Sequence, residues 1–330
     1  MRVTVFDERA YYKPFDYPQF YEWYEKHEAA HWLPKEVPLI EDMKDWNKRL
    51  TNEERTFLTQ IFRFFTQADV DVASAYSTEY LPVFVLPEIR MMLLSFGARE
   101  AIHVQAYSHL IDTLGMPEVT YRQFLDYQEM RDKHEYYERA IGNFSDKKTK
   151  KDIVKKIAIF AAFTEGMQLF SSFVMLLNFA RAENGGKMRG MSQIVTWSIL
   201  DETMHTFGMI DLFREIIKEY PEIWTEKFKA ELYQVARDMV DLEDRFIDLA
   251  YEGYPLVANL AKEDLKQYIR YIADRRLNLL GLKDNWNIER NPLLWVEEMI
   301  NAPIHTNMFE NRVTDYAKGM LTGSWSEVFA

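Results

Sequence analysis

Two short segments of the sequence place a glutamate and a histidine three residues apart: Glu100-Ala-Ile-His103 and Glu202-Thr-Met-His205. Because a helix turns about 100° per residue, side chains at this spacing share a face. Each segment therefore directs one carboxylate and one imidazole toward the same point. Two such pairs on different helices, joined by carboxylates from two more helices, are the ligand pattern of a carboxylate-bridged dinuclear metal site.

Two further acids lie in apolar helical segments, where an unpaired carboxylate is costly to bury. Glu165 is the only charged residue between Lys156 and Arg181, and Asp69 lies in a segment rich in Phe, Val and Ala. Asp71, two residues further on and so on another helix face, competes with Asp69. Any one of these acids alone could pair with a nearby Arg or Tyr, but the set together has a common solution in two bound cations.

Four carboxylates balance the charge of two divalent cations. A ligand set of oxygens with two imidazoles suits iron or manganese better than zinc or copper. It also leaves coordination positions open for O₂ or water. A single Glu-x-x-His is common by accident, as Glu28-Ala-Ala-His31 shows. That third segment is polar and close to Pro34, so we interpret it as a solvated helix face.

Composition restricts the class of protein. The 330 residues are 48% hydrophobic and carry a net charge of -12 without a basic stretch, which argues against nucleic-acid binding. The sequence has no cysteine, which excludes disulfides, zinc–thiolate sites and a Cys nucleophile. The Met1 end lacks an apolar signal core, so we expect a cytoplasmic protein. Residues 157–180 are apolar enough to span a membrane, but they contain Glu165, and we predict a core helix instead.

With only 12 Gly and 11 Pro, the chain favours long helices and few turns. Residues 1–50 read as irregular because four prolines interrupt them, and no segment alternates as a strand would. We predict one all-α domain over residues 1–302 and a C-terminal tail over 303–330. The helical patterns cover about 51–81, 88–114, 120–140, 148–183, 189–219, 222–252 and 262–281, with a short piece near 292–301.

The order and spacing of these motifs resemble the small, radical-generating subunit of class I ribonucleotide reductase, over about residues 20–330. The resemblance implies a ferritin-like helical bundle with a buried dinuclear site, and it favours Asp69 over Asp71. It implies iron as the favoured metal, with manganese possible. It assigns one metal to Asp69, Glu100 and His103, and the other to Glu165, Glu202 and His205.

The resemblance also implies a radical path. Tyr107, one turn after His103, corresponds to the family's stable tyrosyl radical. O₂ would react with the reduced metal centre, which oxidises Tyr107, and the oxidising equivalent would pass to a large catalytic subunit that reduces ribonucleotides to deoxyribonucleotides. The residues implied for this transfer are Trp32, Asp201, Glu310 and Tyr316, with the last residues, about 325–330, docking on the large subunit.

A homodimer and an activating flavoprotein are further implied partners. Two positions depart from the family near the site: Ser198 replaces an apolar residue and Leu169 a common Phe, whereas Phe173 keeps its aromatic ring. These differences leave open whether Tyr107 or the metals store the oxidant. A ferritin-like iron store and a stand-alone dimetal oxidase are alternatives, but neither accounts for Trp32, Tyr107 and the relay tail together.

Overall fold

The computed structural model describes residues 3–142 and 149–307. The described residues are mostly helical, with one short pair of strands, which confirms the all-α prediction; the chain divides into two units, residues 1–292 and 293–330. The α-helices of the first unit are α1 (Pro18–Ala29), α2 (Ile40–Lys48), α3 (Asn52–Ala75), α4 (Pro87–Thr113), α5 (Val119–Arg122), α6 (Gln128–Gly142), α7 (Lys150–Ile157), α8 (Phe170–Leu177), α9 (Arg189–Glu219), α10 (Glu226–Ala250) and α11 (Lys262–Leu279). The second unit contains α12 (Leu294–Asn307).

Short 3-10 and π-helical segments connect or extend these helices. The two π-helical segments are η2 (Tyr76–Tyr80), which continues α3, and η4 (Ala158–Gln168), which joins α7 to α8. The 3-10 segments are η1 (Pro34–Glu36), η3 (Gln123–Asp126), η5 (Asn178–Ala180), η6 (Ala182–Asn184) and η7 (Pro221–Ile223). Two-residue strands β1 (Leu256–Val257) and β2 (Leu260–Ala261) pair antiparallel.

The prediction of an irregular segment over residues 1–50 is wrong, because α1 and α2 lie there. Pro18 is the first residue of α1, a position where its missing N–H costs no hydrogen bond and its fixed φ favours the helix. The patterns over 120–140 and 148–183 are each divided into several elements. The pattern predicted over 189–219 coincides with α9.

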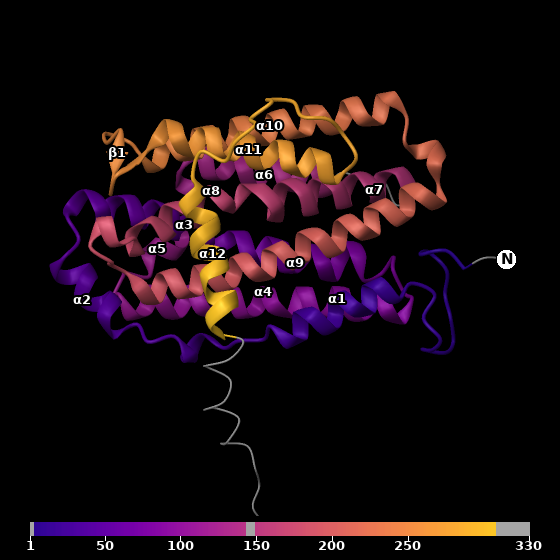
Figure 1. The fold of residues 1–330 in the computed structure, drawn as a ribbon, viewed down its shortest axis with the longest axis horizontal. Coiled ribbons are helices and arrows are strands. Elements are labelled where there is room, and N and C mark those ends of the chain that lie inside the picture. The colour runs from indigo at the N-terminus through magenta and orange to yellow at the C-terminus, as the bar shows by residue number, and fades with distance from the viewer. Residues whose placement is uncertain (1–2, 143–148, 308–330) are drawn as a thin grey trace, which may run out of the picture. The chain divides into compact units, whose positions relative to one another are not determined.

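The long helices of the first unit pack side by side, and many neighbours are far apart in the sequence (Figure 1). Helix α4 packs against α1, α3 and α9, and α9 also packs against η4 and α8. Helices α10 and α11 cover the other side of η4. The helices that carry the two Glu-x-x-His segments, α4 and α9, therefore lie side by side in the interior.

The apolar stretch that resembled a membrane span is a core helix of this bundle. Over residues 150–180, α7, η4 and α8 follow one another, and 94% of the most apolar window is buried. Neighbouring helices, rather than lipid, cover this stretch, as the prediction of a core helix requires.

Helix α9 is anchored by buried acids of α2. The carboxylate of Asp42 accepts hydrogen bonds from the backbone N–H groups of Gly190 (2.9 Å) and Met191 (2.7 Å), and Asp45 accepts one from Met188 (2.8 Å). These N–H groups belong to the first turn of the helix or precede it, where no helical partner exists. A Cβ atom at residue 190 would lie 2.7 Å from Asp42 Oδ2, so the close approach requires glycine. The register of α9 is thereby fixed at its start.

We expect Asp42→Ala to lower the free energy of unfolding by about 1–3 kcal/mol, because it leaves two buried N–H groups without acceptors. Urea denaturation followed by circular dichroism measures this loss. Glu41→Ala is the matched control, since Glu41 is exposed and its ion pair with Lys44 lies at the surface. Equal stability of the two variants would show that Asp42 does not anchor α9.

Candidate metal centre

Five of the six predicted ligands meet inside the bundle. Glu100 and His103 lie on α4, Glu165 on η4, and Glu202 and His205 on α9, and all five are at most 1% exposed. One ligand atom from each of Glu100, Glu165, Glu202 and His205 lies within 4.8 Å of the others. Glu100, Glu165 and His205 lie on three different elements and are 40 to 105 positions apart in the sequence. They meet because these elements pack side by side.

The two imidazoles share the carboxylates between them. His205 Nδ1 lies 3.0 Å from Glu100 Oε1, 3.4 Å from Glu165 Oε1 and 3.3 Å from Glu202 Oε2. His103 Nδ1 lies 3.3 Å from Glu100 Oε2 and 3.2 Å from Glu202 Oε1. Glu100 and Glu202 thus each reach toward both histidines, as ligands placed between two cations do.

The geometry of these contacts fits cation ligands better than hydrogen bonds. Both carboxylate oxygens of Glu100, Glu202 Oε2 and His205 Nδ1 are buried without a hydrogen-bond partner in the described parts of the chain. Buried polar atoms ordinarily have such partners. Ligands held at about 2.1 Å by one octahedral cation lie about 3 Å from each other, as these atoms do. The donor set therefore fits divalent cations.

The charges of the clustered carboxylates and imidazoles also indicate that the cluster binds divalent cations. Burial, together with the charges of Glu202 and Glu100, raises the pKa of Glu165 to about 8, although the neighbouring His205 opposes the rise. Burial disfavours the charged forms of both histidines, yet the surrounding carboxylates raise the pKa of His103 and of His205 well above the ordinary value. The carboxylates therefore need positive charge beside them, and divalent cations would supply it.

The sixth predicted ligand, Asp69, lies in α3, but its side chain is outside what the structure describes. Its competitor Asp71 is described and lies elsewhere. Asp71 Oδ2 is 2.7 Å from His134 Nδ1 of α6, and Asp71 is not part of the Glu–His cluster. Pairing with His134 accounts for Asp71 as a structural acid.

Asp201 connects His103 to Trp32. Its Oδ2 accepts a hydrogen bond from the Trp32 indole at 2.8 Å and lies 3.1 Å from His103 Nε2. Its Oδ1 accepts one from Arg99 at 2.7 Å. A carboxylate on Nε2 fixes the imidazole so that Nδ1 faces the cluster. Arg99 was missed by the sequence reasoning, although a charge in an apolar helix directly before Glu100 could have indicated it.

Glu165 projects from a π-helical segment, a wider helix form that occurs often at functional sites. Arg276 of α11 is buried and donates from Nε to the backbone oxygen of Gly166 at 2.7 Å. A Cβ atom at residue 166 would lie 2.9 Å from Arg276 Nε and 2.6 Å from Ala161 O. Glycine beside Glu165 thus allows the buried arginine to hold this irregular turn in place.

Tyr107 of α4 and Tyr76 of η2 are both buried. Tyr107 is 2% exposed, and its ring stacks on Phe65 with centroids 4.4 Å apart. Phe65 in turn stacks on Phe173. Tyr76 of η2 donates to Glu165 at 3.0 Å. No sequence signal marked Tyr76, because its contact depends on how η2 packs against η4.

The remaining predicted residues have different places. Ser198 and Leu169 are both buried, and the Ser198 hydroxyl has no hydrogen-bond partner within the described chain. Glu310 and Tyr316 lie outside the described residues.

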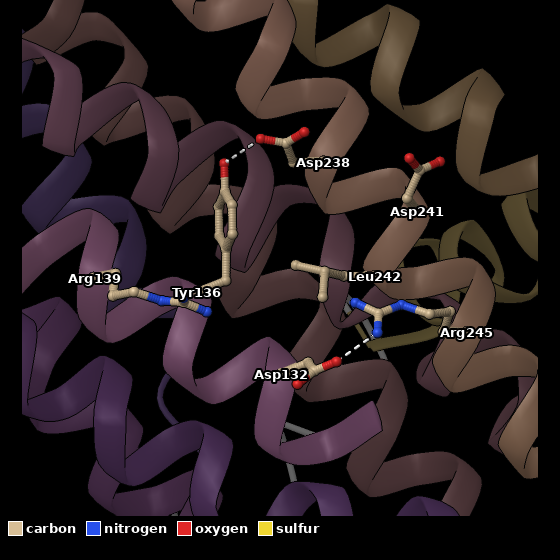
Figure 2. Close-up of a pocket in the computed structure, with 7 residues that line it drawn as sticks. All are labelled: Asp132, Tyr136, Arg139, Asp238, Asp241, Leu242 and Arg245. Carbon is tan, nitrogen blue, oxygen red and sulfur yellow. Dashed lines mark hydrogen bonds and ion pairs between the residues drawn. The ribbon is translucent and has the colours of Figure 1, made fainter. Parts of the chain in front are cut away.

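A surface pocket of about 350 Å³ lies between α6 and α10, and none of its residues belongs to the Glu–His cluster (Figure 2). Asp132 forms an ion pair with Arg245, and Tyr136 donates to Asp238 at 3.2 Å. The residues that line this pocket include no histidine and no glutamate, so it does not repeat the donor set of the buried cluster.

Tyr76→Phe removes the hydroxyl that donates to the Glu165 carboxylate, and we expect it to lower the free energy of unfolding of the metal-free protein by about 1–3 kcal/mol. Tyr80→Phe is the matched control. Tyr80 belongs to the same π-helical segment and is equally buried, but its hydroxyl has no partner among the described residues. Denaturation curves compare the two, and a loss in Tyr80→Phe as large as that in Tyr76→Phe would contradict the role of the hydrogen bond.

Comparison with known proteins gives one family. Residues 9–292 match the family "Ribonucleotide reductase, small chain". The chain is 50% identical over 359 residues to the probable ribonucleoside-diphosphate reductase small subunit 376L of Invertebrate iridescent virus 6, covering 99% of each protein. Its fold is similar to the ribonucleotide reductase R2 subunit of Clostridium botulinum (TM-score 0.80, 24% identity, 86% of this chain and 88% of that one). It is also similar to the dimanganese(II)-NrdF of Streptococcus sanguinis (TM-score 0.72, 21% identity, 84% and 95%). The chain belongs to the ribonucleotide reductase small-chain family.

Proposed function

We propose that this chain uses a dinuclear metal centre to generate the radical of a class I ribonucleoside-diphosphate reductase, and that a large catalytic subunit uses it to reduce ribonucleotides. The observation that carries the proposal is the convergence of three buried glutamates and two histidines from α4, η4 and α9. Membership of the small-chain family supports it. When bound, the metal pair supplies the oxidising equivalent by reaction with O₂.

The proposed ligands are those expected from the sequence: Asp69, Glu100, His103, Glu165, Glu202 and His205. Iron is favoured for this set, and manganese suits the same oxygen and imidazole donors. The name of the Streptococcus sanguinis relative describes a dimanganese protein, which is consistent with manganese as an occupant.

Tyr107 is the proposed site of the radical. Its burial and its stack on Phe65 keep water from the ring, as storage of an oxidised side chain requires. The proposed path outward begins at His103 and continues through Asp201 to Trp32, which the hydrogen bonds at 3.1 and 2.8 Å connect. Asp201 also fixes the tautomer of His103, because its carboxylate accepts a hydrogen bond from the Nε2–H group of that ring.

The proposal includes the arrangement of the whole chain. Residues 1–302 form the helical domain, and 303–330 form a tail in which Glu310 and Tyr316 continue the transfer and the last residues bind the large subunit. A homodimer, a cytoplasmic location and an activating flavoprotein belong to the same proposal.

In the metal-loaded protein exposed to O₂, we expect Tyr107→Phe to abolish the organic radical signal in electron paramagnetic resonance while metal content stays unchanged. Phenylalanine keeps the stack on Phe65 but has no phenol to oxidise. Tyr80→Phe, which removes another buried hydroxyl, is the control and should keep the signal. A persistent organic radical in Tyr107→Phe would refute the assignment.

A variant truncated after residue 305 should keep its metals and its radical but lose nucleotide reduction when mixed with the large subunit, because the proposed relay and docking residues are gone. Nucleotide turnover and electron paramagnetic resonance on the same sample separate these properties. Unaltered nucleotide reduction would refute the relay tail, and a stand-alone oxidase would keep turning over its own substrate.

A further inference from the structure

A second chain of hydrogen bonds leads from the cluster to the surface through α1 and α4. His205 Nε2 lies 3.1 Å from Nε2 of His27, and His27 Nδ1 lies 2.6 Å from the Ser95 hydroxyl. Ser95 donates to Oε1 of Glu28 at 2.5 Å. His27 is fully buried and Ser95 is 6% exposed, whereas Glu28 is exposed. The chain therefore connects a buried proposed ligand to a surface carboxylate in three steps.

The surface carboxylate sets the direction of every bond in this chain. An ionised carboxylate only accepts hydrogen bonds, so the single Ser95 proton points to Glu28. The Ser95 oxygen must then accept from His27, which places the His27 proton on Nδ1. A neutral imidazole has one N–H, so His27 Nε2 is an acceptor and His205 Nε2 carries the proton. His205 Nδ1, which faces Glu100, Glu165 and Glu202, is left with a free lone pair.

The surroundings of His27 support a neutral ring. His27 is fully buried, and the Arg99 guanidinium donates to its backbone oxygen at 3.2 Å, so a second positive charge on the ring would be costly there. Asp201 Oδ1 is a charged acceptor near the ring, but at 3.7 Å from His27 Nε2 it is too far for a hydrogen bond, and it already accepts from Arg99. The His27 Nε2 atom therefore has His205 as its partner.

We propose that Glu28, Ser95 and His27 are positioning residues that fix the tautomer of His205 and so make Nδ1 its metal-binding nitrogen. The inference rests on the proposed metal centre and extends it. The two histidines are held in different ways: His103 by the carboxylate of Asp201 directly, and His205 by a carboxylate that acts through a hydroxyl and a neutral imidazole. Glu28, which the sequence placed on a solvated helix face, thereby acts on the proposed metal ligand His205 through Ser95 and His27.

Two pairs of variants test the chain. Ser95→Ala removes the acceptor for His27 Nδ1–H, whereas Ser95→Thr keeps the hydroxyl and should restore the wild-type behaviour. Glu28→Gln introduces an amide that can also donate to Ser95, which allows the whole chain to reverse and leaves the proton of His205 on Nδ1. Glu22→Gln removes an equally exposed charge from α1 and is its matched control.

Nitrogen-15 NMR of histidine-labelled, metal-free protein reads the His27 tautomer without a bound cation to impose it, with His27→Gln identifying the His27 signals. We expect His27 protonated on Nδ1 in the wild type, Ser95→Thr and Glu22→Gln, and a mixture of tautomers in Ser95→Ala and Glu28→Gln. Titration with Mn²⁺ should show about a tenfold weaker affinity for one ion in Ser95→Ala, the usual size of a loss from an outer hydrogen-bonding partner. Glu28→Gln should show a smaller loss.

The outcomes separate this inference from the proposed function. Normal Mn²⁺ binding by a wild type whose metal-free form has His27 protonated on Nε2 would overturn the positioning chain alone. An unchanged His27 tautomer and unchanged Mn²⁺ affinity in Ser95→Ala would do the same. Failure of the wild type to bind either Zn²⁺ or Mn²⁺ would overturn the proposed metal centre, and with it this inference.

Discussion

The architecture depends on one electrostatic constraint: several carboxylates lie together in a dry helical core. Glu100, Glu165 and Glu202 are at most 1% exposed, and they share the same few ångströms of space. Like charges in a medium of low dielectric repel strongly unless cations lie between them. The two histidines provide positive charge in part, and divalent cations would complete it. The long helices, their anchored ends and the π-helical turn around Glu165 all serve to hold these acids at a fixed separation.

Around this cluster, the protein fixes the orientation of each imidazole from behind. Asp201 engages His103, Trp32 and Arg99 at once, so one residue connects the cluster to an aromatic ring more than 160 positions away in the sequence. His205 depends on His27 instead, with Ser95 and Glu28 behind it. Both arrangements leave Nδ1 facing the glutamates. The difference between them makes the two halves of the centre chemically distinct.

Local periodicity was enough to predict the Glu-x-x-His segments, because residues three apart on a helix share a face whatever the rest of the chain does. An isolated Glu165 in an apolar run was likewise visible from the cost of burying a lone charge. The π-helical form of η4 was not visible, because its hydrogen-bond pattern changes the spacing without an obvious change in composition. Tyr76 and His27 depend on how separate helices pack. His27 also lies in a polar stretch of sequence, which concealed its complete burial.

Anomalous diffraction from crystals of this protein grown with Mn²⁺ shows directly whether the buried carboxylates hold two cations. We expect two anomalous peaks per chain, one bound by His103 and the other by His205, with the carboxylates of Glu100 and Glu202 adjoining both and Glu165 on the side of His205. A single peak, or manganese found only at surface carboxylates while the buried glutamates bind none, would contradict it.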